Sequence, residues 1–129
     1  MRRVLLFVAL LAFALVGCGS GKARVKGRLV ENGQALTFAP TSAAVELTLL
    51  KEDGTPDRTK VTTAVVDTDG SFEVAASGGE VPIGTYAIGL KLPAALQKKY
   101  AKLAAPASPI RRKVVAGPND LTIDLARPN

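Results

Sequence analysis

The chain has 129 residues, of which 17 are Lys or Arg and 11 are Asp or Glu, and its formal net charge is +6. This length corresponds to one small domain. Because the chain contains one Cys and no His, it cannot build a zinc site, an internal disulfide, a Cys-His nucleophile pair or a Ser-His-Asp triad from its own residues. The composition therefore predicts a protein that is not an enzyme and that uses neither a metal nor another cofactor.

The first 17 residues are predicted to be a secretory signal. Residues 1–3 are Met-Arg-Arg, a short positive segment, and an uninterrupted apolar run extends from Val4 to Val16, which is the layout of such signals. A membrane-spanning helix needs about 20 apolar residues, and this run is shorter. We therefore expect residues 1–17 to form a signal helix that targets the chain for export and does not remain as a membrane span.

The single Cys follows this apolar run directly. The order Leu15, Val16, Gly17, Cys18 resembles the lipobox of bacterial lipoproteins. The resemblance implies that a diacylglyceryl group is attached to the sulfur of Cys18, that cleavage occurs just before this residue, and that residues 18–129 form the mature chain. Two or three acyl chains hold a protein stably on a membrane, whereas one does so only marginally. A plain secretory signal with a chance Cys is the alternative interpretation.

The residue after the Cys bears on location. It is Gly19 and not Asp, so by analogy with Gram-negative sorting the chain lacks an inner-membrane retention signal, and we expect a cell-envelope protein anchored in the outer membrane and facing the periplasm. Removing Arg2 and Arg3 from the 17 basic residues leaves 15 against 11 acidic ones, a net charge of +4. The basic residues group at 22–28, 98–102 and 111–113, which would suit anionic lipid or glycan, although solvated strand and helix faces have the same pattern.

Residues 18–22 are predicted to form a lipidated tether, and residues 23–127 a β-sandwich domain. Apolar and polar residues alternate with a period of two over several short segments, which is typical of half-buried strands. Turn residues separate these segments, above all Asn32-Gly33, the strongest short hairpin signal, and Gly117-Pro118-Asn119, which predicts a closing hairpin. We expect about seven strands in an antiparallel, Ig-like or prealbumin-like sandwich, drawn from segments 23–30, 34–38, 44–50, 59–66, 71–75, 85–92, 110–116 and 121–126.

One segment interrupts the strand pattern. Leu96, Tyr100 and Leu103 are spaced i, i+4 and i+7, which predicts a short helical insertion near 94–104. An inserted segment between two strands that carries cations and an aromatic ring is the best candidate for a contact surface. The alternative is a cover packed over the end of the core, for which the same apolar spacing is suited. The candidate contact residues are Lys98, Lys99, Tyr100 and Lys102.

The acidic segment 67–73 also has two interpretations. It contains Asp67, Asp69 and Glu73, but an EF-hand calcium loop needs oxygen ligands over twelve positions, and here an alternating strand begins after Gly70. Asp and Gly supply the hydrogen bonds and the positive φ that turns need. We therefore interpret the segment as a hairpin turn without a metal.

Four stretches resemble the carboxypeptidase regulatory-like domain, a prealbumin-like (transthyretin-like) β-sandwich. They are 25–30 (VKGRLV), 32–36 (NGQAL), 68–72 (TDGSF) and 82–86 (PIGTY). The tail from Tyr100 to Leu125 is similar to small lipoproteins of planctomycete-like bacteria. Family members often carry Pro-Gly before the Tyr strand, so the turn at 82–84 is expected to differ by a residue. Tyr86 is expected to bury its ring while its hydroxyl reaches a backbone group.

These observations lead to a functional hypothesis. We expect a lipid-anchored envelope protein with a non-catalytic structural or protein-interaction role, whose partners are the membrane, through the acyl chains on Cys18, and an envelope protein or glycan. The alternative is a module that binds a glycan, or a peptide added at a sheet edge. A nucleic-acid partner is not expected, because the mature chain offers few aromatic side chains for base stacking, namely Phe38, Phe72, Tyr86 and Tyr100.

Overall fold

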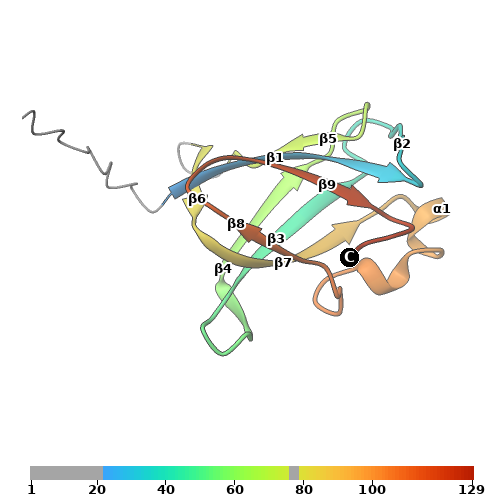
Figure 1. The fold of residues 1–129 in the computed structure, drawn as a ribbon. Helices are drawn as coiled ribbons and strands as arrows, with labels where there is room; N and C mark the ends of the chain where they lie inside the picture. Colours follow the sequence, from blue (N-terminus) through green and yellow to red (C-terminus); the bar gives the residue numbers. More distant parts are fainter. Residues whose placement is uncertain (1–21, 76–78) are drawn as a thin grey trace, which may run out of the picture.

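The computed structural model of the protein describes residues 22–75 and 79–129. Within these ranges the chain forms an all-β sandwich of two sheets with one short helical segment (Figure 1). The strands are β1 (Lys22–Glu31), β2 (Gln34–Ala35), β3 (Ala44–Leu50), β4 (Pro56–Val65), β5 (Ser71–Glu73), β6 (Val81–Pro82), β7 (Gly84–Lys91), β8 (Arg111–Val114) and β9 (Gly117–Asp124).

Sheet A is built around β1. The strands β6, β5 and β2 pair antiparallel with successive parts of β1, and β9 pairs with it in parallel from Ala23↔Gly117 to Val30↔Asp124. Sheet B has the order β4-β3-β7-β8 and is antiparallel throughout. The sandwich prediction is therefore confirmed, with one parallel strand pair in a fold expected to be antiparallel.

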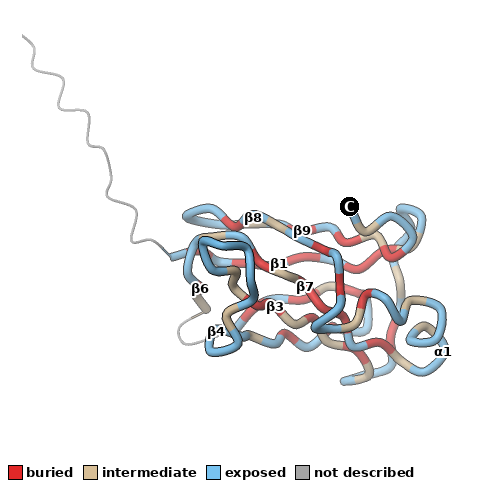
Figure 2. Tube along the Cα trace, turned by 90° about the horizontal axis from the view of Figure 1, so that it is seen from below, coloured by how far each residue is buried: buried red, intermediate tan, exposed pale blue. Residues whose placement is uncertain are grey.

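The core lies between the two sheets and follows the alternation of the sequence. On β1 the side chains of Ala23, Val25 and Leu29 are buried, while Arg24 and Lys26 between them are exposed. Buried stretches run along β1, β7 and β9 in Figure 2. The burial of these apolar faces is the main stabilising contribution to the fold.

The predicted hairpin around Gly117-Pro118-Asn119 is wrong. Strand β8 pairs with β7 in sheet B, whereas β9 pairs with β1 in sheet A, so this segment crosses between the sheets. The Asn119 side chain stabilises the crossing: its Oδ1 accepts a hydrogen bond from the N–H of Val115 at 3.0 Å, and its Nδ2 donates to the carbonyl of Arg24 at 3.2 Å. Residues typical of a tight turn thus serve here to connect two layers.

Two local predictions are confirmed. Asn32 and Gly33 have φ angles of 50° and 78° and join β1 to β2 by a two-residue hairpin turn, for which positive φ at both positions is required. The buried Tyr86 donates a hydrogen bond from its hydroxyl to the carbonyl of Pro82 at 2.6 Å. The hydroxyl thereby fixes the entry of β7, where Gly84 has a φ of 149°.

The insertion between β7 and β8 is short and helical, as predicted. It holds one α-helical turn, α1 (Ala94–Gln97), and one 3-10 turn, η2 (Ala101–Leu103). No side-chain hydrogen bond caps α1, which starts after Pro93, and so short a helix gains little stability on its own. The insertion lies at the end of the sandwich opposite the start of β1 (Figure 1).

The expected signal helix and the lipobox, Leu15 to Cys18, lie outside the described residues. No helix in the described part of the chain is long and apolar enough to span a membrane.

Candidate functional site

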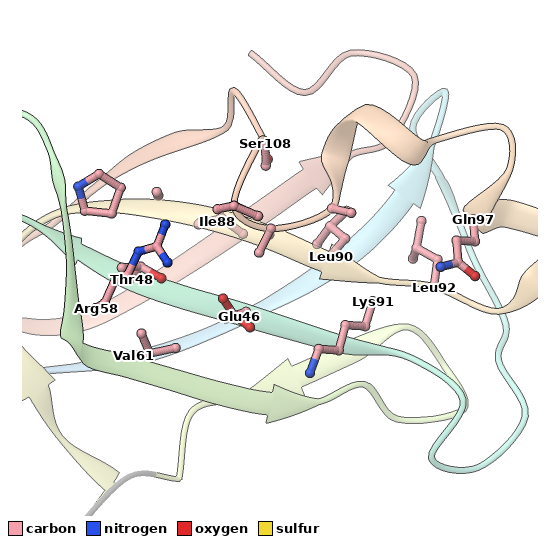
Figure 3. Close-up of a pocket in the computed structure, with 16 residues that line it drawn as sticks. Glu46, Thr48, Arg58, Val61, Ile88, Leu90, Lys91, Leu92, Gln97 and Ser108 are labelled. Carbon is pink, nitrogen blue, oxygen red and sulfur yellow. The ribbon is translucent and has the colours of Figure 1, made fainter.

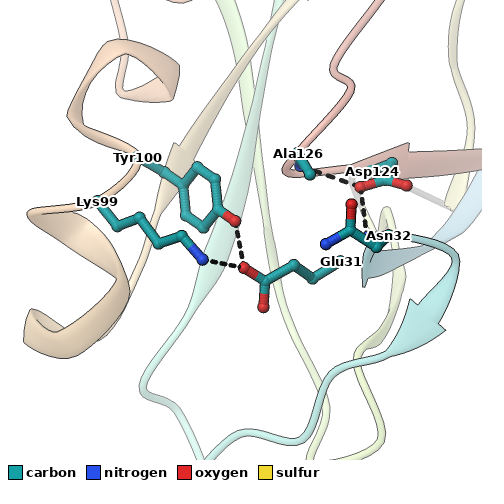
Figure 4. A network of polar contacts seen from close by, with 6 residues as sticks. All are labelled: Glu31, Asn32, Lys99, Tyr100, Asp124 and Ala126. Carbon is teal, nitrogen blue, oxygen red and sulfur yellow. Dashed lines mark hydrogen bonds and ion pairs between the residues drawn. The ribbon is translucent and has the colours of Figure 1, made fainter.

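The insertion uses two of its four candidate contact residues within the fold. Nζ of Lys99 lies 2.5 Å from Oε1 of Glu31, and the hydroxyl of Tyr100 donates a hydrogen bond to the same oxygen (Figure 4). The Lys99 ammonium also lies 5.1 Å from the centre of the Tyr100 ring, within the range of a cation–π contact. These contacts fasten the insertion to the end of β1.

The electrostatics of this cluster agree with its geometry. The hydrogen bond from Lys99, followed by that from Tyr100, lowers the pKa of Glu31. The same contact with Glu31 raises the pKa of Lys99. Both partners reach solvent, so the pair orients the insertion more than it stabilises the fold.

The apolar side of the insertion packs on the core as its spacing predicts. Leu103 is buried, and Leu96 and Tyr100 are half-buried against the core cluster. The remaining candidates, Lys98 and Lys102, are exposed. The segment therefore has the properties of the packed cover, while Lys98 and Lys102 remain exposed and make no ion pair in the described part of the chain.

The sequence did not reveal the role of Asp124, which the strand pattern placed simply outward. Its Oδ1 accepts hydrogen bonds from the N–H groups of Asn32 and Ala126, and its Oδ2 accepts one from Gly33, each at 3.0 Å. Burial opposes ionisation of this carboxyl, but the backbone donors outweigh that effect and lower its pKa. Asn32 and Gly33 are 92 and 91 residues away from Asp124 in the chain, so no local sequence pattern indicates these two hydrogen bonds.

The acidic segment 67–73 forms the predicted turn. The N–H of Gly70 donates to the carbonyl of Asp67 at 3.0 Å, and Oδ1 of Asp69 accepts hydrogen bonds from the N–H and the hydroxyl of Ser71 at 3.0 and 2.5 Å. Within residues 22–75 and 79–129, no three His, Cys, Asp or Glu side chains are grouped closely enough to hold a metal ion.

A hollow surface lies elsewhere, on the outer face of sheet B. This cavity of about 670 Å³, which we call the sheet B trough, is bounded by outer-face residues of β3, β4 and β7 and by residues of the insertion (Figure 3). Its main residues are Glu46, Thr48, Arg58, Val61, Ala87, Gly89, Lys91, Gln97, Ala105 and Pro106.

Small residues create the trough. Ala87 and Gly89 lie at alternate positions on the outer face of β7, where Ala87 leaves room above the sheet and Gly89 lets the insertion approach closely. Gly89 is buried because the insertion passes directly over it: a Cβ at this position would lie 2.4 Å from Cβ of Ala105 and 2.8 Å from its backbone nitrogen. The insertion thus forms one wall of the trough, and strand β4, at the edge of sheet B, forms the other.

The trough holds charged side chains that the fold does not pair. In the described part of the chain, the ion pairs join Lys22 to Glu80 and Lys99 to Glu31, so Glu46, Arg58 and Lys91 have no ion-pair partner there. Between them, Thr48 is only 9% exposed and Val61 is 43% exposed. The sequence placed Glu46 and Lys91 at outward positions of separate predicted strands and Arg58 just before another, and their convergence depends on strand order.

Comparisons with known proteins give a distant likeness in fold. No protein-family model and no curated protein matches the chain. The fold is similar to that of a solved DUF3823 family protein from Parabacteroides merdae, with a TM-score of 0.49 and 15% sequence identity. The match covers 78% of this chain and 44% of that one, so the chain spans less than half the length of that protein. A likeness at this level assigns neither a family nor a function.

Proposed function

We propose that the chain is a lipid-anchored cell-envelope protein with a non-catalytic role, which binds another envelope protein through the sheet B trough. The observation that carries the binding role is the trough itself, an open surface where Glu46, Arg58 and Lys91 gather without ion-pair partners in the described part of the chain. Charged side chains without an ion-pair partner in the described part of the chain are suited to an external partner.

The proposed anchor rests on the lipobox resemblance at Leu15, Val16, Gly17 and Cys18. Strand β1 begins at Lys22, so a Cys18 carrying acyl chains would hold the sandwich close to the membrane surface. By the same sorting analogy, Gly19 favours the outer membrane with the domain in the periplasm.

Membership of the carboxypeptidase regulatory-like family, in its planctomycete-type lipoprotein form, is also part of this proposal. Its support is structural: the stretches that carry the resemblance form the Asn32-Gly33 turn, the Gly70 turn and the Tyr86 contact with Pro82. These features support a fold shared with that family, and they do not indicate which ligand is bound.

A protein partner is preferred to a glycan. None of the 16 residues that line the trough is aromatic, and sugar rings are commonly bound against aromatic faces. The charged groups and the adjoining edge strand β4 are better suited to a polypeptide.

Metabolic labelling with a fatty acid tests the anchor. The wild-type chain is expected to incorporate the label and Cys18→Ser to lose it completely. Equal labelling of the two chains would refute lipidation at this residue.

Site-directed photo-crosslinking in intact cells tests the binding role. A photoreactive residue at Val61, in the trough, is expected to give a discrete protein adduct that disappears in the Glu46→Lys background. The matched position is Thr122, an exposed residue on the outer face of sheet A, where no such adduct is expected. Adducts of equal yield at both positions, or adducts that Glu46→Lys leaves unchanged, would contradict a specific role for the trough.

A further inference from the structure

Along the direction of strand β3, the charged side chains of the trough alternate in sign. Strand pairing places Lys91 beside Ala44, Glu46 beside Gly89, and Thr48 between Val61 and Ala87. Beyond the Thr48–Val61 pair the register shifts, Leu50 pairs with Pro56, and Arg58 lies on β4 in the irregular stretch between these two pairs, where it lines the trough. In Figure 3, Arg58 lies near Thr48, Glu46 lies in the middle, and Lys91 lies toward the other end. Read from Lys91 to Arg58, the side chains are positive at Lys91, negative at Glu46, neutral at Thr48 and positive at Arg58.

This order has the spacing of an extended polypeptide. Residues two apart on one face of a strand are separated by about 6.6 Å, because each residue advances the chain by about 3.3 Å. Successive levels of β3 share that spacing, so a peptide lying along the trough would place every second side chain over one level. The levels from Ala44 to Leu50 span 7 residues of β3, which sets the length of the peptide at about 7 residues.

The chemistry of the facing side chains follows from complementarity. Over Lys91 and Arg58 an acidic side chain is favourable, and over Glu46 a basic one. Over Thr48 and Val61 a small apolar side chain fits, because Thr48 is nearly buried and Val61 presents an apolar surface. A like-charged side chain at any of the charged levels would be repelled.

We infer that the sheet B trough takes an extended segment of an envelope protein in which a basic side chain over Glu46 is flanked by acidic side chains over Lys91 and Arg58. This inference rests on the proposed function, and it adds the chemistry of the partner. Reading one face of the segment from Lys91 to Arg58, the order is acidic, basic, small apolar, acidic.

Two labelled peptides of identical composition test the order. The matching peptide is Glu-Thr-Lys-Thr-Val-Thr-Glu, and the control, Lys-Thr-Glu-Thr-Val-Thr-Glu, exchanges the first two charges and keeps the same net charge. Fluorescence anisotropy with the full-length chain in detergent micelles is expected to show binding of the matching peptide about tenfold tighter, since the exchange turns two attractions into two repulsions. At about 1 M salt, where the screening length is about 3 Å, this preference should shrink.

A charge exchange in the protein gives the reciprocal test. The double variant with Glu46→Lys and Lys91→Glu is expected to prefer the control peptide, whereas Glu73→Lys, on the outer face of sheet A, should keep the wild-type preference. Binding of both peptides with equal affinity, binding of neither, or an unchanged preference in the double variant would overturn the inference. If the double variant does not fold, the wild-type preference and its salt dependence still decide the matter.

Other occupants would give different results. Self-association of the chain that depends on Glu46 and needs no peptide, measured by sedimentation velocity, would indicate a second copy in the trough and would overturn the inference. Displacement of a bound peptide by an oligosaccharide of N-acetylglucosamine would do the same in favour of a glycan. The peptide experiments test the order of charges in the partner, whereas crosslinking at Val61 tests whether the trough binds a protein at all. Failure of the inferred order is therefore distinguishable from failure of the proposed function.

Discussion

Single side chains in this sandwich join segments that are far apart in the sequence. The carboxylate of Asp124 on β9 accepts hydrogen bonds from the β1–β2 turn and from Ala126 at the end of the chain. Hydrogen bonds of this kind, with an ionised acceptor, are stronger than neutral ones. The turn predicted from Asn32-Gly33 is thus held by a residue that no local pattern connects with it.

Substitution Asp124→Asn is expected to lower stability at neutral pH and to flatten its dependence on pH. The folded-state pKa of Asp124 is lowered, so its stabilisation is complete above the unfolded pKa of about 3.9 and is lost as the pH falls through the lower folded pKa. In the variant, an amide N–H₂ group replaces one acceptor and faces a backbone donor. Denaturant titrations from about pH 2 to pH 7 measure both effects.

The matched control for that experiment is Asp120→Asn. Asp120 lies on the same strand, β9, and its side chain is exposed on the outer face of sheet A. Its loss should leave the denaturation midpoint almost unchanged. If both variants behave alike, the stabilisation attributed to the hydrogen bonds of Asp124 is refuted.

A second prediction at this scale concerns Tyr86→Phe. The variant keeps the buried ring but removes the hydroxyl that donates to the carbonyl of Pro82 at 2.6 Å. We expect the free energy of unfolding to fall by about 1 kcal/mol, the net value of a typical hydrogen bond. Tyr100→Phe, at a half-buried position, should cost less, because the hydroxyl bonds a carboxylate that reaches solvent, and should mainly loosen the insertion from Glu31. A fall in stability larger for Tyr100→Phe than for Tyr86→Phe would contradict this assignment.

At the scale of elements, the sequence predicts strands well and their partners less well. Val45 and Leu47 alternate with Glu46 and Thr48, and β3 occupies the predicted segment from Ala44 to Leu50. Alternation of apolar and polar residues indicates which side chains share a face, because the side-chain period of a strand is two. It does not indicate which strand pairs with which. For that reason the pairing of β8 and β9 was wrong, and the parallel β1–β9 pair was not foreseen.

The shortest elements and the trough were beyond prediction for a similar reason. Strand β6 has 2 residues, too few to show any period. The trough depends on the small size of Ala87 and Gly89. Their size has this effect only because neighbouring elements bring Glu46, Arg58 and Ala105 around them. The sequence predicts a contact surface on the insertion instead, because charge and an aromatic ring are adjacent there.

The insertion and sheet B are expected to separate locally in Gly89→Ala. The added Cβ would lie 2.4 Å from Cβ of Ala105 and 2.9 Å from its Cα, so the segment over β7 must move outward. Overpacking of this kind costs about 1–3 kcal/mol. Hydrogen exchange should show lost protection confined to the insertion, and the matching peptide should bind more weakly.

The control for this prediction is Thr85→Ala, an exposed residue on the same strand. It should leave both exchange and peptide binding unchanged. Uniform loss of protection across both sheets in Gly89→Ala would show that the contact with Ala105 supports the whole fold and not the trough wall alone.

At the scale of the whole molecule, the two ends of the described chain are joined. Strand β1 at the beginning and β9 at the end pair over eight residue levels, from Ala23↔Gly117 to Val30↔Asp124. Strand β9 also contributes Leu121 and Ile123 to the core, and Leu125 directly after the strand is buried there too. A chain that lacks this strand has neither a complete sheet A nor a closed core.

Removal of residues 117–129 is therefore expected to unfold the whole domain. Each buried Leu or Ile contributes about 1.5–3 kcal/mol, so three of them supply an amount comparable with the entire stability of a typical domain, about 5–15 kcal/mol. Circular dichroism should show loss of the β spectrum and of any cooperative thermal transition. Removal of residues 128–129 alone, which sacrifices the hydrogen bond from Arg112 to the carbonyl of Pro128, should leave the transition in place. A cooperative transition in the longer truncation would show that sheet B and the rest of sheet A fold without β9.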